Sequence, residues 1–245
     1  MTADSRSVDW SDDPGPSRTL FDTSIRVLLV DDETSFLDLL AAHLGAQPNL
    51  EIVGTAKTVA DALDMALERR PDVVVIDVHL PDGDGIDAVP QLKELCPDAR
   101  ILILTSNGDA DSLLRAAEAG VAGWMSKDSP LIDTVHAVSI MGTGGLVVSP
   151  TTLARLIRDT RSNGREVPTA QRLHLTSREL DVLTCLGRGL DERATAKDIG
   201  ITRNTCHGYI KSLYAKLGAH SQLEAVVAAV HVGLLPDLHM DRTPL

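Results

Sequence analysis

The stretch IRVLLVDDE, residues 25–33, indicates the fold of the first part of this chain. Its first six residues form a short apolar run, which is typical of a strand buried on both faces of a parallel sheet. Further runs of this kind follow along the chain: LEIVGTA at 50–56, DVVVID at 72–77, RILILTS at 100–106 and the weaker GWMSK at 123–127. We therefore expect five strands between residues 25 and 127.

The segments that separate these runs carry apolar residues at helical spacing. Leu63 and Leu67 mark the second of these helices, and Val135 and Val138 mark the fifth. Strands that alternate with helices in five units predict an α/β domain with a doubly wound, five-stranded parallel sheet. We set this domain at residues 24–145. The preceding residues, 1–23, are rich in Asp, Ser, Pro and Gly, and we expect them to form a disordered tail.

Polar or charged side chains end four of the five predicted strands. Asp31 and Asp32 follow the first strand, Asp77 the third, Thr105 the fourth and Lys127 the fifth. Because the carboxyl ends of parallel strands meet at one edge of a sheet, we expect these five side chains to converge. Three clustered carboxylates repel one another unless a cation joins them, and oxygen ligands of this kind favour Mg²⁺. The pattern predicts a magnesium site at which Asp77, already ionised, attacks a phosphoryl group while Lys127 and Thr105 stabilise the transferring oxygens.

The last part of the chain differs from the first in charge and in pattern. The whole chain carries a net charge of −12, residues 1–170 carry −13, and residues 171–220 carry +3. Thr176 and Glu179 have the spacing of a capping box at a helix start, and glycines recur where helices would end. We expect an all-α domain of four helices at residues 172–236, with a connecting helix and linker at 146–171 before it and a tail at 237–245 after it.

The segment from Thr202 to Leu217 is predicted to be the third of these helices. One face carries the apolar side chains Ile210, Leu213 and Leu217. The opposite face carries polar and basic side chains, namely Arg203, Asn204, His207, Lys211 and Ser212. Arg and Lys bind DNA phosphates, and Asn and Arg read base edges in the major groove, so this face is a predicted DNA-binding surface.

Two families resemble the two parts of the chain. Residues 25–142 resemble the receiver domain of bacterial two-component response regulators, on the motifs VLLVDDE, VVVIDVHLPDGDGID, ILILTS and GWMSKD. Residues 173–235 resemble the LuxR/NarL-type helix-turn-helix module. Together they identify the chain as similar to a NarL/FixJ-type response regulator, a transcription regulator that binds DNA. The resemblance implies the sheet order 2-1-3-4-5 and a homodimer in the active state.

The receiver resemblance also implies roles for individual residues. Asp77 is the phosphoacceptor, and its phosphoryl group comes from a sensor histidine kinase. The implied Mg²⁺ ligands are Asp32, Asp77, the backbone carbonyl of His79 and, through water, Asp31. Thr105 and Trp124 take the place of switch residues, although the family usually has Tyr or Phe where Trp124 stands. The second resemblance implies a dimer contact through an apolar stripe on the last helix, formed by Leu223, Val226, Val227 and Val230.

Composition and motifs limit the remaining possibilities. Aromatic residues make up only 2% of the chain, which argues against a module that stacks nucleic-acid bases. The three cysteines form no metal or disulfide pattern, which favours the cytoplasm, and no apolar run is long enough to cross a membrane. Two alternatives stay open: a DNA-binding regulator whose receiver responds to a ligand or protein partner without phosphorylation, and a Mg²⁺-dependent phosphohydrolase that forms an aspartyl phosphate. The phosphohydrolase alternative calls for a second Asp two residues after the nucleophile, where this chain has His79, and we expect no conventional enzyme.

Overall fold

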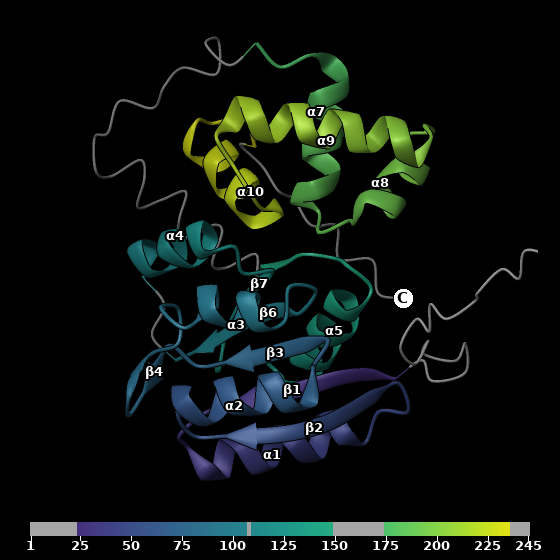
Figure 1. The fold of residues 1–245 in the computed structure, drawn as a ribbon. Coiled ribbons are helices and arrows are strands. Elements are labelled where there is room, and N and C mark those ends of the chain that lie inside the picture. Colours follow the sequence, from purple (N-terminus) through teal and green to yellow (C-terminus); the bar gives the residue numbers. More distant parts are fainter. Residues whose placement is uncertain (1–23, 107–108, 149–173, 236–245) are drawn as a thin grey trace, which may run out of the picture.

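The structure is a computed structural model, and it describes residues 24–106, 109–148 and 174–235 (Figure 1). Within these residues the chain forms an α/β domain followed by a helical domain, as the sequence predicts. The expected tails at 1–23 and 237–245, and most of the expected linker, lie outside the described residues. None of the helices in the described ranges has the length and apolar character needed to cross a bilayer.

Six parallel strands form the main sheet, in the order β2-β1-β3-β6-β7-β8. Their bounds are β1 (Ile25–Val30), β2 (Leu50–Ala56), β3 (Val73–Ile76), β6 (Arg100–Thr105), β7 (Gly123–Ser126) and β8 (Val147–Val148). The first five confirm the predicted order 2-1-3-4-5. The edge strand β8 was not predicted and falls in the segment assigned to the connecting helix and linker. It pairs with β7 over only two residues, too few to produce a recognisable strand pattern.

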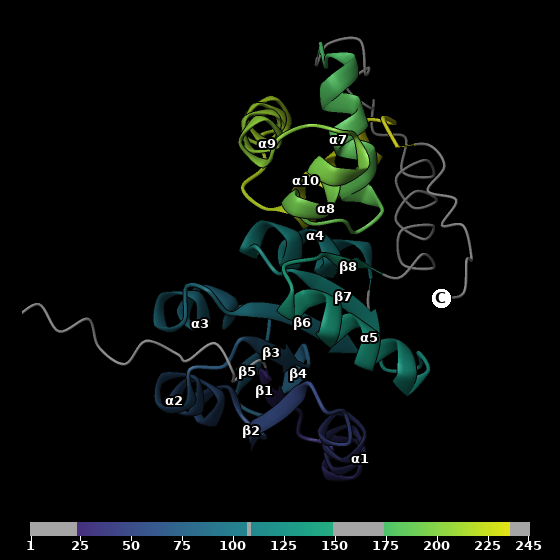
Figure 2. The ribbon, with the colours of Figure 1, turned by 90° about the vertical axis from the view of Figure 1, so that its right-hand side faces the viewer.

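Helices cover both faces of this sheet (Figure 2). They are α1 (Thr34–Gly45), α2 (Val59–Arg69), α3 (Val89–Leu95), α4 (Ala110–Ala119) and α5 (Leu131–Gly142). Alternate strand residues point to opposite faces, so Leu29 packs with residues of α1 and α5, whereas Leu28 packs with residues of α2 and α3. This two-sided burial is the reason that the strands appear as continuous apolar runs in the sequence.

A short hairpin follows β3 and was not predicted. Its strands are β4 (His79–Leu80) and β5 (Gly83–Asp84), which pair antiparallel. The Asp82 carboxylate at the turn accepts hydrogen bonds from the backbone amides of Val59 and Ala60, at 2.8 and 3.0 Å, and so ties the hairpin to the start of α2. The hairpin therefore fixes the position of the residues that follow Asp77.

Four helices form the second domain, which confirms the predicted number within the described residues. They are α7 (Ser177–Gly187), α8 (Glu192–Asp198), α9 (Arg203–Leu217) and α10 (Gln222–His231). The predicted capping box is present, because the Thr176 side chain accepts from the Glu179 amide and the Glu179 carboxylate accepts from the Thr176 amide. Helix α9 ends at Gly218, whose φ of 68° lies in the left-handed region that glycine adopts readily.

The two domains contact each other along α4 and the β8 edge (Figure 2). Helix α10 packs against α4, and the Ser221 hydroxyl donates to the Ala117 carbonyl at 3.4 Å. The Leu146 amide donates to the Gly189 carbonyl of the second domain at 3.3 Å. Buried apolar residues of both domains form one continuous cluster, so the contact between the domains is apolar as well as hydrogen-bonded.

Candidate functional site

The three predicted carboxylates converge at the carboxyl edge of the sheet. Asp31 follows β1 and Asp77 follows the neighbouring strand β3, where the Asp77 amide donates to the Val30 carbonyl at 3.0 Å. One carboxylate oxygen from each of Asp31, Asp32 and Asp77 lies within 4.8 Å of the others. Asp31 and Asp77 are only 4% and 6% exposed, whereas Asp32 is exposed.

Lys127 joins two of these carboxylates. Its ammonium lies 2.6 Å from Asp31 Oδ2 and 2.7 Å from Asp77 Oδ2, and 5.1 Å from the centre of the Phe36 ring. Burial alone would lower the pKa of Lys127, but the hydrogen bonds to Asp31 and Asp77 outweigh it and raise the pKa above its ordinary value. Lys127 is therefore a cation at neutral pH, in the position predicted for a group that binds a phosphoryl oxygen.

The carboxylates remain incompletely compensated, which is the basis for testing the fit of Mg²⁺. Asp77 Oδ1 is buried and has no hydrogen-bond partner among the described residues. Burial raises the pKa of Asp31, although hydrogen bonds from Lys127 and from the Glu33 amide oppose that shift. One lysine faces three acidic groups, and a buried carboxylate oxygen with no donor is costly. This set of oxygen ligands fits Mg²⁺, which Asp31, Asp32 and Asp77 would hold.

The other predicted residues of this site lie at or near the same edge. Thr105 ends β6, beside β3, and is buried; its carbonyl accepts from the Lys127 amide at 3.0 Å. Trp124 is buried in β7, opposite Val148 of the unpredicted strand β8. His79 is exposed in β4, two residues after Asp77. The switch roles of Thr105 and Trp124, and the ligand role of the His79 carbonyl, stay predictions.

Three residues that support the site were missed at the sequence level. A Cβ atom on Gly85 would lie 2.0 Å from the Asp77 carbonyl oxygen, so only glycine fits there. Phe36 contacts the Lys127 ammonium through its ring. Arg115 of α4 bonds to Asp84 and Asp87, at 2.9 and 2.7 Å, next to the hairpin. The repeated Asp-Gly of PDGDG was a usable signal for Gly85, whereas nothing in the sequence pattern singles out Phe36 or Arg115.

Four of the five predicted DNA-binding residues are exposed on α9. They are Arg203, Asn204, His207 and Lys211. Two of them share a carboxylate on α8: Arg203 Nε lies 2.8 Å from Glu192 Oε1, and His207 Nδ1 lies 3.0 Å from Glu192 Oε2. Apart from the neighbouring backbone of α9, no atom of the described residues lies within 4 Å of the position that a Cβ on Gly208 would take, which leaves this face open.

The structure corrects the prediction for Ser212. Its hydroxyl donates to Glu179 Oε1 at 2.7 Å, and this carboxylate also accepts from Lys216 Nζ at 2.7 Å. Glu179 is only 3% exposed, so Ser212 points toward the interior of the domain and not toward DNA. The sequence analysis grouped it with Lys211 on the polar face, but consecutive helix positions differ by about 100°, and in this structure Ser212 faces Glu179 of α7.

The structure also corrects the predicted dimer contact on α10. Leu223, Val226, Val227 and Val230 are all buried within this chain. They pack into the core that α10 shares with α7, α9 and the receiver-like domain. An apolar stripe on a short helix was therefore the inner face of a packed helix, and these residues are not available to a second copy in this structure.

Comparison with known families agrees with this arrangement. Residues 27–139 match the response regulator receiver domain, and residues 173–229 match the luxR family of bacterial regulatory proteins. The chain is 34% identical to the DNA-binding transcriptional activator DevR/DosR of Mycobacterium tuberculosis over 208 residues, which cover 85% of this chain and 95% of that protein. It is 28% identical to the transcriptional regulatory protein LnrK of Bacillus subtilis, covering 86% of this chain and 98% of that protein.

Solved structures show the same folds. A LuxR-family two-component response regulator from Aurantimonas sp. is 29% identical, with a TM-score of 0.53, over 56% of this chain and 97% of that one. The RcsB response regulator of Salmonella typhimurium is similar in fold, at 20% identity and a TM-score of 0.53, over 83% of this chain and 97% of that one. The likeness thus extends across both domains.

Proposed function

This chain belongs to the response regulators that join a receiver domain to a LuxR-family DNA-binding domain, and from that premise we propose that phosphorylation of Asp77 controls its binding to DNA. The observation that supports the assignment most directly is the acidic site itself. It holds two buried carboxylates, a third exposed one, and a lysine within hydrogen-bond distance of Asp31 and Asp77.

The proposed transfer uses the side chains at that site. A carboxylate oxygen of Asp77 attacks the phosphorus of a phosphohistidine on a sensor kinase. The new P–O bond forms as the P–N bond breaks, and the electron pair of that bond returns to the imidazole nitrogen. Lys127 and Thr105 stabilise charge on the transferring oxygens. Mg²⁺ bound by Asp31, Asp32 and Asp77, with the His79 carbonyl as a further ligand, would neutralise the acidic groups and the incoming phosphate.

The second domain supplies the proposed output. Helix α9 presents Arg203, Asn204, His207 and Lys211 to solvent, and these side chains suit phosphate and base contacts on double-stranded DNA. We place the protein in the cytoplasm, where it would act on DNA as a homodimer after phosphorylation. The proposed domain limits remain 24–145 and 172–236.

An Asp77→Asn exchange tests the phosphoacceptor. The full chain is incubated with acetyl phosphate and Mg²⁺, and intact mass spectrometry follows the phosphorylated fraction. We expect phosphorylation of the native protein and none of the variant, because an amide cannot act as the nucleophile. Asp38→Asn is the matched control, since Asp38 is an exposed carboxylate on α1, and it should be phosphorylated like the native chain.

Three outcomes would overturn the proposal in different ways. Phosphorylation that survives Asp77→Asn would place the acceptor elsewhere. Phosphorylation at Asp77 that changes neither operator affinity nor oligomeric state would instead favour a receiver controlled by a ligand or protein partner. Rapid turnover of small phosphoesters by the purified chain would favour the phosphohydrolase alternative.

A further inference from the structure

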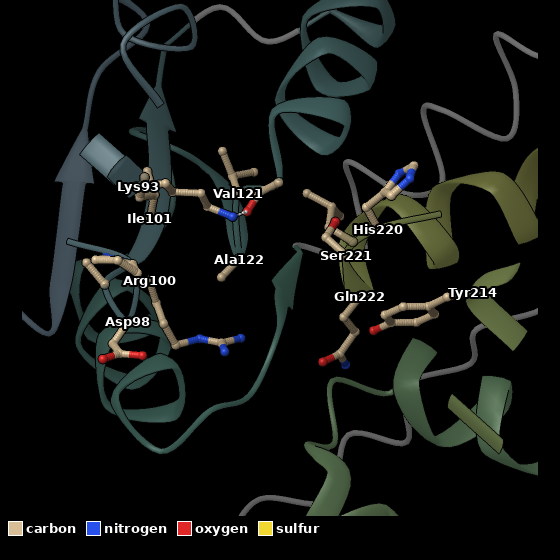
Figure 3. A pocket seen from close by; sticks show the side chains of 14 residues that line it. Lys93, Asp98, Arg100, Ile101, Val121, Ala122, Tyr214, His220, Ser221 and Gln222 are labelled. Carbon is tan, nitrogen blue, oxygen red and sulfur yellow. Dashed lines mark hydrogen bonds between the residues drawn. The ribbon is translucent and has the colours of Figure 1, made fainter. Parts of the chain in front are cut away.

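We propose that a cavity between the two domains binds a small anion that carries a phosphate group. The cavity has a volume of about 320 Å³. Its receiver wall comes from α3, the start of β6 and the turn between α4 and β7, and its other wall comes from α9 and the start of α10 (Figure 3). Arg100, at the amino end of β6, lines it, so the cavity lies at the opposite edge of the sheet from Asp77.

Two cations from the receiver domain line this cavity. Arg100 donates to the Gly145 carbonyl at 2.9 Å, but its Nε is buried and has no hydrogen-bond partner within the part of the chain that the structure describes. Lys93 donates one hydrogen bond to the Gly120 carbonyl, which leaves two of its three donor positions. Burial lowers the pKa of both side chains, and for Lys93 the nearby charge of Arg100 adds to that effect.

No carboxylate of the described residues forms an ion pair with Arg100 or Lys93. Asp98 lines the cavity but is exposed, and Asp191 attracts Arg100 electrostatically without direct contact. Two partly buried cations that repel each other without a bonded counter-charge make the cavity unfavourable when empty of anions. An anion placed between them would remove that cost.

The second domain contributes polar groups to the same space. The Tyr214 hydroxyl points across the cavity toward the Arg100 guanidinium, and Ser221 and Gln222 lie beside it (Figure 3). Ser221 caps α10 by accepting from the Glu224 amide, and its hydroxyl donates to the Ala117 carbonyl. Gln222 Nε2 donates to the Leu186 and Leu190 carbonyls, so of these three residues Tyr214 is the donor that this domain offers a ligand. Burial raises the pKa of Tyr214 to about 12, although Arg100 opposes the shift, so its hydroxyl stays protonated and can donate.

This combination favours a phosphate over a carboxylate. A guanidinium, an ammonium and a hydroxyl line one cavity, and a phosphate group has more acceptor oxygens and more charge than a single carboxylate. The volume is at the lower end for ligand pockets, which indicates a small molecule. Because the donors come from both domains, such a ligand would stabilise their contact.

Isothermal titration calorimetry of the full chain with inorganic pyrophosphate tests this inference. EDTA is present, so that no anion can bind at Asp77 through Mg²⁺. We expect one saturable site per chain, and affinity reduced about tenfold or more by Arg100→Gln or by Lys93→Gln, because each exchange removes a charged hydrogen-bond donor. Tyr214→Phe should weaken binding less. Arg69→Gln is the matched control; Arg69 is half exposed on α2, away from the cavity, and the exchange should have no effect.

Further measurements test whether pyrophosphate binds in this cavity and whether the site prefers phosphate to carboxylate. Lys211→Gln, on the proposed DNA-binding face, should leave pyrophosphate affinity unchanged, and succinate should bind more weakly than pyrophosphate. Pyrophosphate should also raise the unfolding midpoint of the native chain more than that of Lys93→Gln at the same concentration. The inference is overturned if the native chain shows no saturable binding, if Lys93→Gln binds as tightly as the native chain, if Lys211→Gln abolishes binding, or if succinate binds more tightly.

Discussion

The acidic site of the receiver domain and the Glu179 cluster of the DNA-binding domain both bury a carboxylate beside a lysine, yet they differ in how completely the charges are satisfied. Glu179 accepts hydrogen bonds from Lys216, Ser212 and the Thr176 amide. At the acidic site, Lys127 bonds to two carboxylates, and Asp77 Oδ1 receives no hydrogen bond from residues 24–106, 109–148 or 174–235. A complete cluster stabilises a fold, whereas an incomplete one keeps capacity for a metal ion and a phosphoryl group.

Removing the lysine of the complete cluster should produce the largest effect on stability. Lys216→Met leaves the Glu179 carboxylate, 3% exposed, without its cation, and we expect the free energy of unfolding of the DNA-binding domain to fall by about 3 kcal/mol. Hydrogen exchange of the α7 and α9 amides measures this loss locally. Lys197→Met, on α8, is the control; an equal loss there would show that Glu179 does not depend on Lys216.

Acid should weaken the same cluster. Burial alone would raise the pKa of Glu179, but hydrogen bonds from Lys216, Ser212 and Thr176 outweigh it and lower the pKa from 4.5 to about 2. A folded-state pKa below the unfolded value gives stability that is complete above about pH 4.5 and is lost as the pH falls toward 2. Urea unfolding followed by circular dichroism should show this loss, and Glu179→Gln should flatten the pH dependence between those limits. An unchanged slope would contradict it.

Magnesium should stabilise the incomplete site and not the complete one. At a hundredfold excess over its dissociation constant, Mg²⁺ should add about 2.7 kcal/mol to the stability of the receiver domain. Thermal unfolding in MgCl₂ and in EDTA measures the gain, which Asp77→Asn should reduce because it removes a ligand. If Mg²⁺ raises the stability of the native chain and of Asp77→Asn equally, it binds somewhere other than among Asp31, Asp32 and Asp77.

The buried, uncharged hydroxyl of Thr195 should give the smallest change in stability when it is removed. Thr195 is fully buried in α8, and none of the residues that the structure describes forms a hydrogen bond with its hydroxyl. Thr195→Val replaces that hydroxyl with a methyl group, so we expect stability to rise by about 1 kcal/mol with DNA affinity unchanged. Chemical unfolding and an operator-binding titration check the two parts. A loss of stability would mean that the hydroxyl has a partner after all.

Much of this architecture could be predicted from local patterns. Continuous apolar runs identified five strands, and the polar residues that end them identified the convergence of Asp31, Asp32 and Asp77, because parallel strands share one carboxyl edge. The capping box at Thr176 and Glu179 was equally local, since both partners lie within one helical turn.

Features that depend on distant contacts could not be predicted in this way. The strand β8 and the hairpin after Asp77 are too short to show a period. Ser212 and the α10 stripe were misassigned because periodicity shows that a helix has an apolar face or a polar face, but not which neighbour covers it. The cavity at Arg100 needs both domains in place, and no segment of the sequence contains it.

Arg115 ties two parts of the molecule that otherwise have separate tasks. It holds α4 to Asp84 and Asp87, in the segment that follows Asp77, while the carbonyl of Ala117, two residues further along α4, accepts from Ser221 at the start of α10. A shift of the hairpin relative to α4 must either stretch these bonds or carry the helix along. The same short helix thus links the segment that follows the phosphoacceptor mechanically to the DNA-binding domain.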